Sequence, residues 1–90
     1  MIVKYSRHFH KSYKLRIKPY PKVRKRFEER LGLFMKDPTN PVLKDHKLIG
    51  KMRTFKAFSI TGDIRVIYFQ ETDFTVIFID IGTHNQVYGK

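Results

Sequence analysis

The chain has 90 residues, a net charge of +11 and no cysteine. This length holds one hydrophobic core, and the lack of cysteine excludes disulfides, iron–sulfur clusters and thiolate zinc sites. No apolar run approaches the roughly 18 residues of a membrane span, and the N-terminus lacks the apolar core of a signal peptide. We therefore expect a single domain over residues 1–90 that is cytoplasmic and does not contact a membrane.

The positive charge is concentrated in the first part of the chain. Residues 1–36 hold twelve Lys or Arg against two acidic residues, which gives +10, whereas residues 37–90 hold seven against six. A domain with a pI near 10.1 attracts polyanions, because binding releases counterions. The charge therefore predicts a nucleic acid, a ribosome or an acidic protein as partner, although a solvated basic surface would have the same composition.

The N-terminal part is expected to form a strand followed by two basic amphipathic helices. Residues 2–5 alternate in the manner of a strand, and Ser6 is suited to cap the first helix. A second helix is expected to begin at Pro21, because proline is tolerated in a first turn. Asp37-Pro38 is expected to end it, because proline disfavours the helical conformation in the residue before it. The apolar stripe of this helix comprises Tyr20, Val23, Phe27, Leu31 and Phe34.

Three strands are expected in the remaining chain, over roughly residues 53–60, 64–70 and 74–81. Their short connections favour antiparallel neighbours, and residues 38–51, with two prolines and a glycine, are expected to form a connector. The order β-α-α-β-β-β predicts an α+β fold. In this fold a helical hairpin covers one face of a small, mainly antiparallel sheet and leaves the other face partly open.

The stretch from Asp80 to Tyr88 follows an apolar run that is expected to be a buried strand. The chain is expected to turn at Gly82 and then to present His84 and Tyr88 four positions apart. Turns at strand ends often position functional side chains. Tyr88 is equally suited to packing near the C-terminus.

Further candidates lie in the second half of the chain. Arg65 belongs to an otherwise apolar strand, where an edge salt bridge is one interpretation, but its side chain is expected on the open face of the sheet. His46 stands in the connector between two lysines, where most histidines are ordinary surface residues. Asp63 lies in the turn before Arg65 and is suited to forming that turn.

Together these groups have the chemistry that RNA cleavage needs. The reaction requires a base for the 2′-hydroxyl, an acid for the leaving oxygen and cations for the phosphate, with no metal or other cofactor. Imidazoles supply both proton transfers near neutral pH, and arginine binds phosphate with two hydrogen bonds. The candidate catalytic residues are His46, Asp63, Arg65, His84 and Tyr88, and the candidate RNA-binding residues are Lys44, Lys47, Lys51 and Lys56.

Four segments of the sequence carry a resemblance to a known family. They are the strand and basic helix pair ending in FMKDP (34–38), LKDHKLIG (43–50), GDIRVIY (62–68) and GTHNQVY (82–88). In this order they resemble the RelE/ParE superfamily of type II toxin–antitoxin systems, and most closely the YafQ-type mRNA interferases. The resemblance extends over essentially the whole chain.

The resemblance implies a ribosome-dependent, metal-independent mRNA endoribonuclease that a cognate acidic antitoxin holds inactive. It implies mRNA and ribosomal RNA as further partners. His46 and His84 match the acid–base positions of the family, and Asp63 matches an aspartate that assists them. Arg65 matches the arginine placed against the scissile phosphate, and Tyr88 falls where the family keeps an aromatic that stacks on a base.

One position departs from the family pattern. YafQ-like enzymes tend to carry a further histidine where this chain has Ser59, and serine cannot replace imidazole as an acid or base near pH 7. Either the proton transfers fall on His46 and His84 alone, or the activity is reduced. Two alternatives follow: a ParE-like toxin that inhibits a protein such as DNA gyrase without cleaving RNA, and a remnant that only binds an antitoxin. The two histidines argue against the first alternative.

Overall fold

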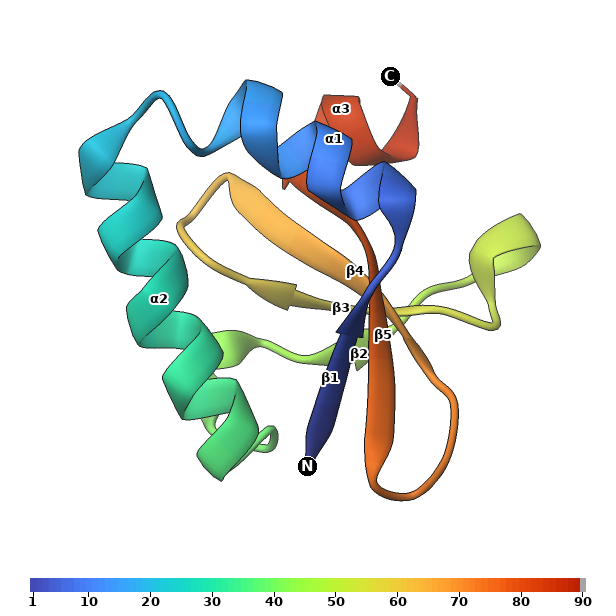
Figure 1. The fold of residues 1–90 in the computed structure, drawn as a ribbon. Helices are drawn as coiled ribbons and strands as arrows, with labels where there is room; N and C mark the ends of the chain where they lie inside the picture. Colours follow the sequence, from blue (N-terminus) through green and yellow to red (C-terminus); the bar gives the residue numbers. More distant parts are fainter. Residues whose placement is uncertain (90) are drawn as a thin grey trace.

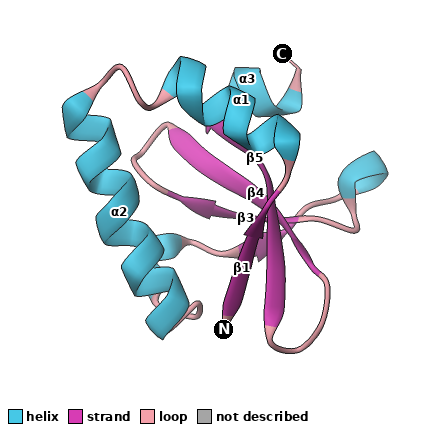
Figure 2. Ribbon diagram, in the orientation of Figure 1, coloured by secondary structure: helices cyan, strands magenta, loops and turns pink. Residues whose placement is uncertain are grey.

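The computed structural model describes residues 1–89 and packs three helices on a five-stranded sheet (Figures 1 and 2). The strands are arranged in the order β1-β5-β4-β3-β2. In chain order the elements are β1 (Ile2–Tyr5), α1 (Arg7–Arg16), α2 (Pro21–Lys36), the short 3₁₀ helix η1 (Pro41–Leu43), β2 (His46–Lys47), a second 3₁₀ helix η2 (Gly50–Met52), β3 (Lys56–Ser59), β4 (Ile64–Gln70), β5 (Thr75–Thr83) and α3 (His84–Tyr88). Over residues 1–89, none of these helices has the length and apolar character to cross a membrane.

Local sequence signals set the limits of the two long helices. The Ser6 hydroxyl accepts a hydrogen bond from the Phe9 amide at 3.0 Å, and it donates one to the Ile79 carbonyl at 3.1 Å. The expected cap is thus confirmed, and it also ties the start of α1 to β5. Pro21 occupies the first turn of α2, and Asp37 is the residue that caps its C-terminus, as expected. Tyr20, in contrast, is exposed and precedes the helix.

The core lies between the helices and the sheet and is rich in aromatic rings. Phe34 of α2 stacks on Phe58 of β3 with ring centroids 4.3 Å apart and an interplanar angle of 11°. Phe9 and Phe27 join α1 to α2 with centroids 6.2 Å apart. These rings and the buried Phe78 of β5 belong to one cluster. The expected α+β arrangement, with helices covering one face of the sheet, is therefore confirmed.

The sheet is mixed, and one irregularity in it bears on the site. β1 runs parallel to β5, whereas β5, β4, β3 and β2 are antiparallel neighbours. Tyr68 pairs with Phe78 but Ile67 pairs with Asp80, so Ile79 is an extra residue in β5. Such a bulge shifts the alternation of side chains beyond it. As a result, Ile81 joins Phe78 in the core.

Three expectations about the limits of elements are wrong. β5 does not turn at Gly82: it continues to Thr83, because pairing of Gly82 with Arg65 and of Thr83 with Ile64 still satisfies the backbone. The strand expected over 53–60 is shorter, because residues 50–52 form η2 and β3 begins only at Lys56. The connector contains a two-residue strand, β2, which pairs with β3 and was not expected.

Candidate active site

A cavity of about 400 Å³ opens on the face of the sheet that α1 and α2 do not cover. Arg65 of β4 contributes to it, while the neighbouring Val66 points into the core. We call it the open-face cavity. Its walls come from the β2–η2 segment, from β4 and from α3, which are far apart in the sequence. The residues that line it are His46, Lys47, Leu48, Ile49, Met52, Arg65, His84 and Tyr88.

One wall of this cavity is the short helix α3. Thr83 caps it: the Thr83 hydroxyl accepts a hydrogen bond from the Gln86 amide, and the Gln86 side chain accepts one from the Thr83 amide. This reciprocal arrangement fixes where the helix begins. His84 and Tyr88 are then one turn apart on the same side of α3, and their ring centroids lie 4.5 Å apart in an edge-to-face arrangement. The two side chains therefore form one aromatic wall.

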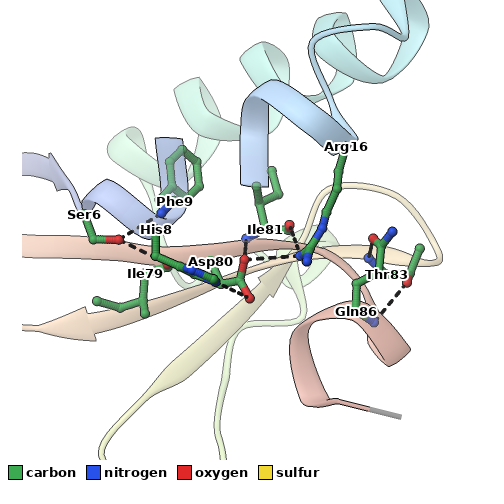
Figure 3. A network of polar contacts seen from close by, with 9 residues as sticks. All are labelled: Ser6, His8, Phe9, Arg16, Ile79, Asp80, Ile81, Thr83 and Gln86. Atoms are coloured by element: carbon green, nitrogen blue, oxygen red, sulfur yellow. Dashed lines mark hydrogen bonds and ion pairs between the residues drawn. The ribbon is translucent and has the colours of Figure 1, made fainter. Parts of the chain in front are cut away.

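A partly buried ion pair joins α1 to the end of β5, the strand that leads into α3, as Figure 3 shows. The Arg16 guanidinium donates to the Asp80 carboxylate at 3.3 Å and to the Ile81 carbonyl at 3.0 Å. His8, on the exposed side, lies 3.4 Å from the same carboxylate. We call the contacts of Arg16 with Asp80 and Ile81 the Arg16 clamp. It joins α1 to the end of β5, directly before the residues of the site.

Two side chains approach Gly82 closely. A Cβ atom there would lie 2.7 Å from the Gln86 side-chain oxygen and 2.9 Å from an Arg16 guanidinium nitrogen. Real Cβ atoms essentially never come so near to other heavy atoms. Both atoms end flexible side chains, so a side chain at position 82 would displace the Arg16 clamp or the α3 cap from their present places against the strand.

The other wall presents His46. Its Nδ1 lies 2.8 Å from the Lys44 carbonyl oxygen, and since a carbonyl only accepts, Nδ1 is the nitrogen that carries hydrogen. The neutral ring then has its lone pair on Nε2. Lys44 has φ +51° and ψ +39°, a left-handed conformation that is uncommon for a residue with a side chain. This strained backbone places the carbonyl that orients His46.

Arg65 lies in the sheet between Ser59 of β3 and Gly82 of β5. Its side chain is half-buried, and its buried Nε has no hydrogen-bond partner among residues 1–89. Over the same residues no ion pair with a carboxylate involves Arg65. The edge salt bridge considered for this residue is therefore not formed in the described part of the chain. A guanidinium in this state is suited to binding an anion.

The remaining predicted site residues lie in different places. Asp63 is exposed in the β3–β4 turn and is not among the residues that line the open-face cavity. Lys47 lines that cavity, and Lys44 lines a neighbouring one. Lys51 lines neither, and the Lys56 ammonium lies 5.9 Å from the centre of the Tyr68 ring.

Two polar pairs near the site were not predicted. The Tyr68 hydroxyl contacts both oxygens of the Asp45 carboxylate at 2.8 Å, and Arg16 contacts Asp80 as described above. Burial, the hydrogen bond with Asp45 and the negative charge of Asp45 raise the pKa of Tyr68 above its ordinary value of 10.0. Two features of the sequence could have indicated these pairs: a tyrosine on the core face of a strand and an acidic residue within an apolar strand. Both are expected to be buried, and buried polar groups need partners.

The fold and the sequence are both similar to those of known bacterial toxins. A family model described as "Bacterial toxin of type II toxin-antitoxin system, YafQ" matches residues 1–89. The crystal structure of YafQ from E. coli strain BL21(DE3) is 26% identical, covers 97% of each chain and has a TM-score of 0.81. YafQ in the E. coli DinJ–YafQ toxin–antitoxin complex is 26% identical over 97% of this chain and 96% of that one, with a TM-score of 0.79. The YoeB/ParE toxin from Agrobacterium tumefaciens shares the fold at 15% identity, covering 93% of this chain and 99% of its own, with a TM-score of 0.76.

No curated protein sequence matches the chain. With its family model matched over nearly its whole length, the chain belongs to the YafQ family of bacterial toxins of type II toxin–antitoxin systems.

Proposed function

We propose that this protein is an mRNA endoribonuclease that acts on the ribosome and uses the open-face cavity as its active site. The observation that carries the proposal is the meeting of two imidazoles and an unpartnered arginine in one cavity, from segments far apart in the sequence. A polyanionic substrate also suits the net charge of +11.

His46 and His84 are assigned the two proton transfers. With hydrogen fixed on Nδ1, His46 offers an unprotonated Nε2 in its neutral form, which suits a base for the 2′-hydroxyl. His84, on the opposite wall, is then assigned the protonation of the leaving 5′-oxygen. Since Asp63 does not line the cavity, we assign it no proton transfer.

Arg65 and Tyr88 are assigned to substrate binding. Arg65 would stabilise the negative charge that develops on the phosphate, because its donors are partly buried and free of protein acceptors over residues 1–89. Tyr88 would stack on a base of the single-stranded RNA. Because Tyr88 is in edge-to-face contact with His84, a base stacked on Tyr88 would lie near the proposed acid.

The test is the substitution His84→Ala in a translation reaction in which cleavage of the translated mRNA is followed. We expect the cleavage rate to fall by about 10²–10⁴, the usual contribution of one acid–base group. His10→Ala, an exposed histidine of α1 outside the open-face cavity, is the matched control. Full activity of His84→Ala would remove His84 from the mechanism. Growth arrest with intact mRNA in cells that express the wild-type protein would favour inhibition of a protein target instead.

We also infer that the protein is held inactive by a cognate antitoxin. YafQ forms the DinJ–YafQ toxin–antitoxin complex, and this chain belongs to the same family. An acidic, amphipathic segment would complement the net charge of +10 carried by residues 1–36.

A further inference from the structure

A second cavity, of about 190 Å³, lies between α2, η1 and the β3–β4 turn. It shares Arg65 with the site of the reaction proposed above. We call it the basic pocket. The residues that line it are Arg26, Arg30, Val42, Lys44, Ser59, Thr61, Gly62 and Arg65.

The basic pocket combines four cationic side chains with no acidic one among its lining residues. Arg30 is partly buried and fixed in place, because its guanidinium donates to the Val42 carbonyl at 3.2 Å and to the Ser59 carbonyl at 3.5 Å. Arg26 is exposed and lies 3.5 Å from Glu29 on the same helix, so that one acid partly offsets its charge. Like charges gathered around so small a space repel one another unless an anion lies between them.

Arg65 connects the basic pocket to the open-face cavity, because it lines both. Its buried Nε has no partner over residues 1–89. Lys44 makes a second connection, since its side chain lines the basic pocket while its carbonyl holds His46 in the open-face cavity. The two cavities are therefore adjacent and share Arg65.

We propose that the basic pocket binds a backbone phosphate of the RNA substrate next to the phosphate that is cleaved in the open-face cavity. The proposal rests on the proposed function and deepens it. Consecutive phosphates along one strand would then lie on either side of Arg65. Binding the neighbouring phosphate fixes the register of the strand, so that the reacting phosphate lies between His46 and His84.

An acidic protein segment is the competing occupant, because carboxylates also pair with arginine. RNA is favoured by the shared Arg65, since only a substrate that enters the open-face cavity would use both sites together. The lining also favours it: apart from Val42 it is cationic, hydroxylic or glycine, with little apolar surface for an amphipathic protein segment.

The test measures binding of a short single-stranded RNA whose riboses carry 2′-O-methyl groups, which cannot be cleaved through the 2′-hydroxyl. Dissociation constants are determined at several salt concentrations for the wild type, Arg26→Gln and Arg24→Gln. Arg24 is exposed, lies on the same helix and has the same charge, but it does not line the basic pocket.

Arg26→Gln should weaken binding about tenfold, the loss expected for one hydrogen bond to a charged group. It should also reduce the slope of log K against log salt by about 0.7, the value for one phosphate contact on a single strand. Arg24→Gln should change both quantities much less.

Arg26→Gln/Arg30→Gln should extend both losses, with melting curves to verify that the double variant is folded. The 2′-O-methyl RNA is not cleaved by the proposed reaction, so a failure of the proposed cleavage leaves the binding result readable. Equal losses in Arg26→Gln and Arg24→Gln, or no measurable RNA binding by the wild type, would overturn the proposal. Loss of affinity for an acidic antitoxin peptide with unchanged RNA binding would assign the basic pocket to that protein instead.

Discussion

Two partly buried arginines, on two sides of the same sheet, have opposite surroundings. Arg16 reaches from α1 to the end of β5, where its guanidinium contacts the Asp80 carboxylate and the Ile81 carbonyl. Arg65 lies in β4 between two cavities, and its buried Nε has no partner among residues 1–89. Arg16 therefore has hydrogen-bond acceptors within the protein, whereas Arg65 has a donor available to a ligand.

The difference separates a polar side chain that stabilises the fold from one that is available to a ligand. A buried donor without an acceptor costs about 1–3 kcal/mol, so a fold selected for stability alone would not keep one. Proteins retain such groups where a ligand supplies the missing partner. The contacts of Arg16 with Asp80 and Ile81 on the helix side therefore stabilise the fold, whereas the unpartnered Nε of Arg65 destabilises it slightly in favour of binding. This comparison leads to three predictions with different readouts.

The largest effect is expected for Arg65→Gln. The rate of mRNA cleavage in a translation reaction should fall by about 10²–10³, as for the loss of one donor to a developing negative charge. The free energy of unfolding should not decrease, because the substitution removes an unpartnered buried donor. Urea denaturation measures the free energy of unfolding. Arg53→Gln, at an exposed arginine that lines neither cavity, is the control. A loss of stability as large as the loss of activity would make Arg65 structural and end the contrast with Arg16.

A smaller effect of the opposite kind is expected for Arg16→Met. The free energy of unfolding should fall by about 1–3 kcal/mol, because Asp80 stays buried without the guanidinium. Arg7→Met, at an exposed arginine of the same helix, should have little effect. Adding Asp80→Asn to Arg16→Met should restore part of the lost stability by removing the charge that has lost its guanidinium partner. No difference between Arg16→Met and Arg7→Met in urea denaturation would mean that the clamp contributes nothing measurable.

The smallest effect is expected for Tyr68→Phe and depends on pH. Because the pKa of Tyr68 is raised in the folded protein, the hydroxyl stays protonated there while the unfolded chain ionises near its ordinary value of 10.0. The resulting stabilisation is fully present below pH 10 and is lost as the pH rises beyond it. The free energy of unfolding should therefore decline less steeply above pH 10 in Tyr68→Phe than in the wild type. Tyr5, whose pKa is also raised by burial, is present in both proteins and does not affect the difference.

Below pH 10 the same substitution should cost about 1 kcal/mol, the typical value of one hydrogen bond, because Asp45 is only partly buried and can be hydrated. Identical slopes above pH 10 for the two proteins would show that Tyr68 ionises normally in the fold.

The fold could largely be predicted from the sequence because its elements carry strong local signals. The Ser6 cap, Pro21 and Asp37-Pro38 limit the two helices, and alternation identifies β4. β2 could not be predicted, because two residues have no periodicity. α3 was missed although Thr83 and Gln86 have the spacing of a capping box, since five residues are too few to show a helical pattern. The bulge at Ile79 also left no signal in the sequence, since it arises from the pairing of β4 with β5.

The site was predictable only in part. Placing Arg65 on the open face follows from strand alternation, and the resemblance brought His46, His84 and Tyr88 to the same region. These four residues do line one cavity. Asp63 was grouped with them on the resemblance, but it lies in the exposed β3–β4 turn and does not line that cavity. The basic pocket was missed because α2 and the β3–β4 turn meet only through tertiary packing.

The parallel pairing of β1 with β5 has a consequence for the order in which the molecule forms. Ile2 pairs with Thr75, so the first strand waits for its neighbour until almost all of the domain has been synthesised. During this time the sheet that buries Phe27 and Phe34 of α2 is incomplete. Pairing between such distant segments also slows folding of the finished chain. The last segments to appear, β5 and α3, carry Asp80, His84 and Tyr88. The growing chain therefore has no assembled open-face cavity, and that cavity first exists when the domain closes.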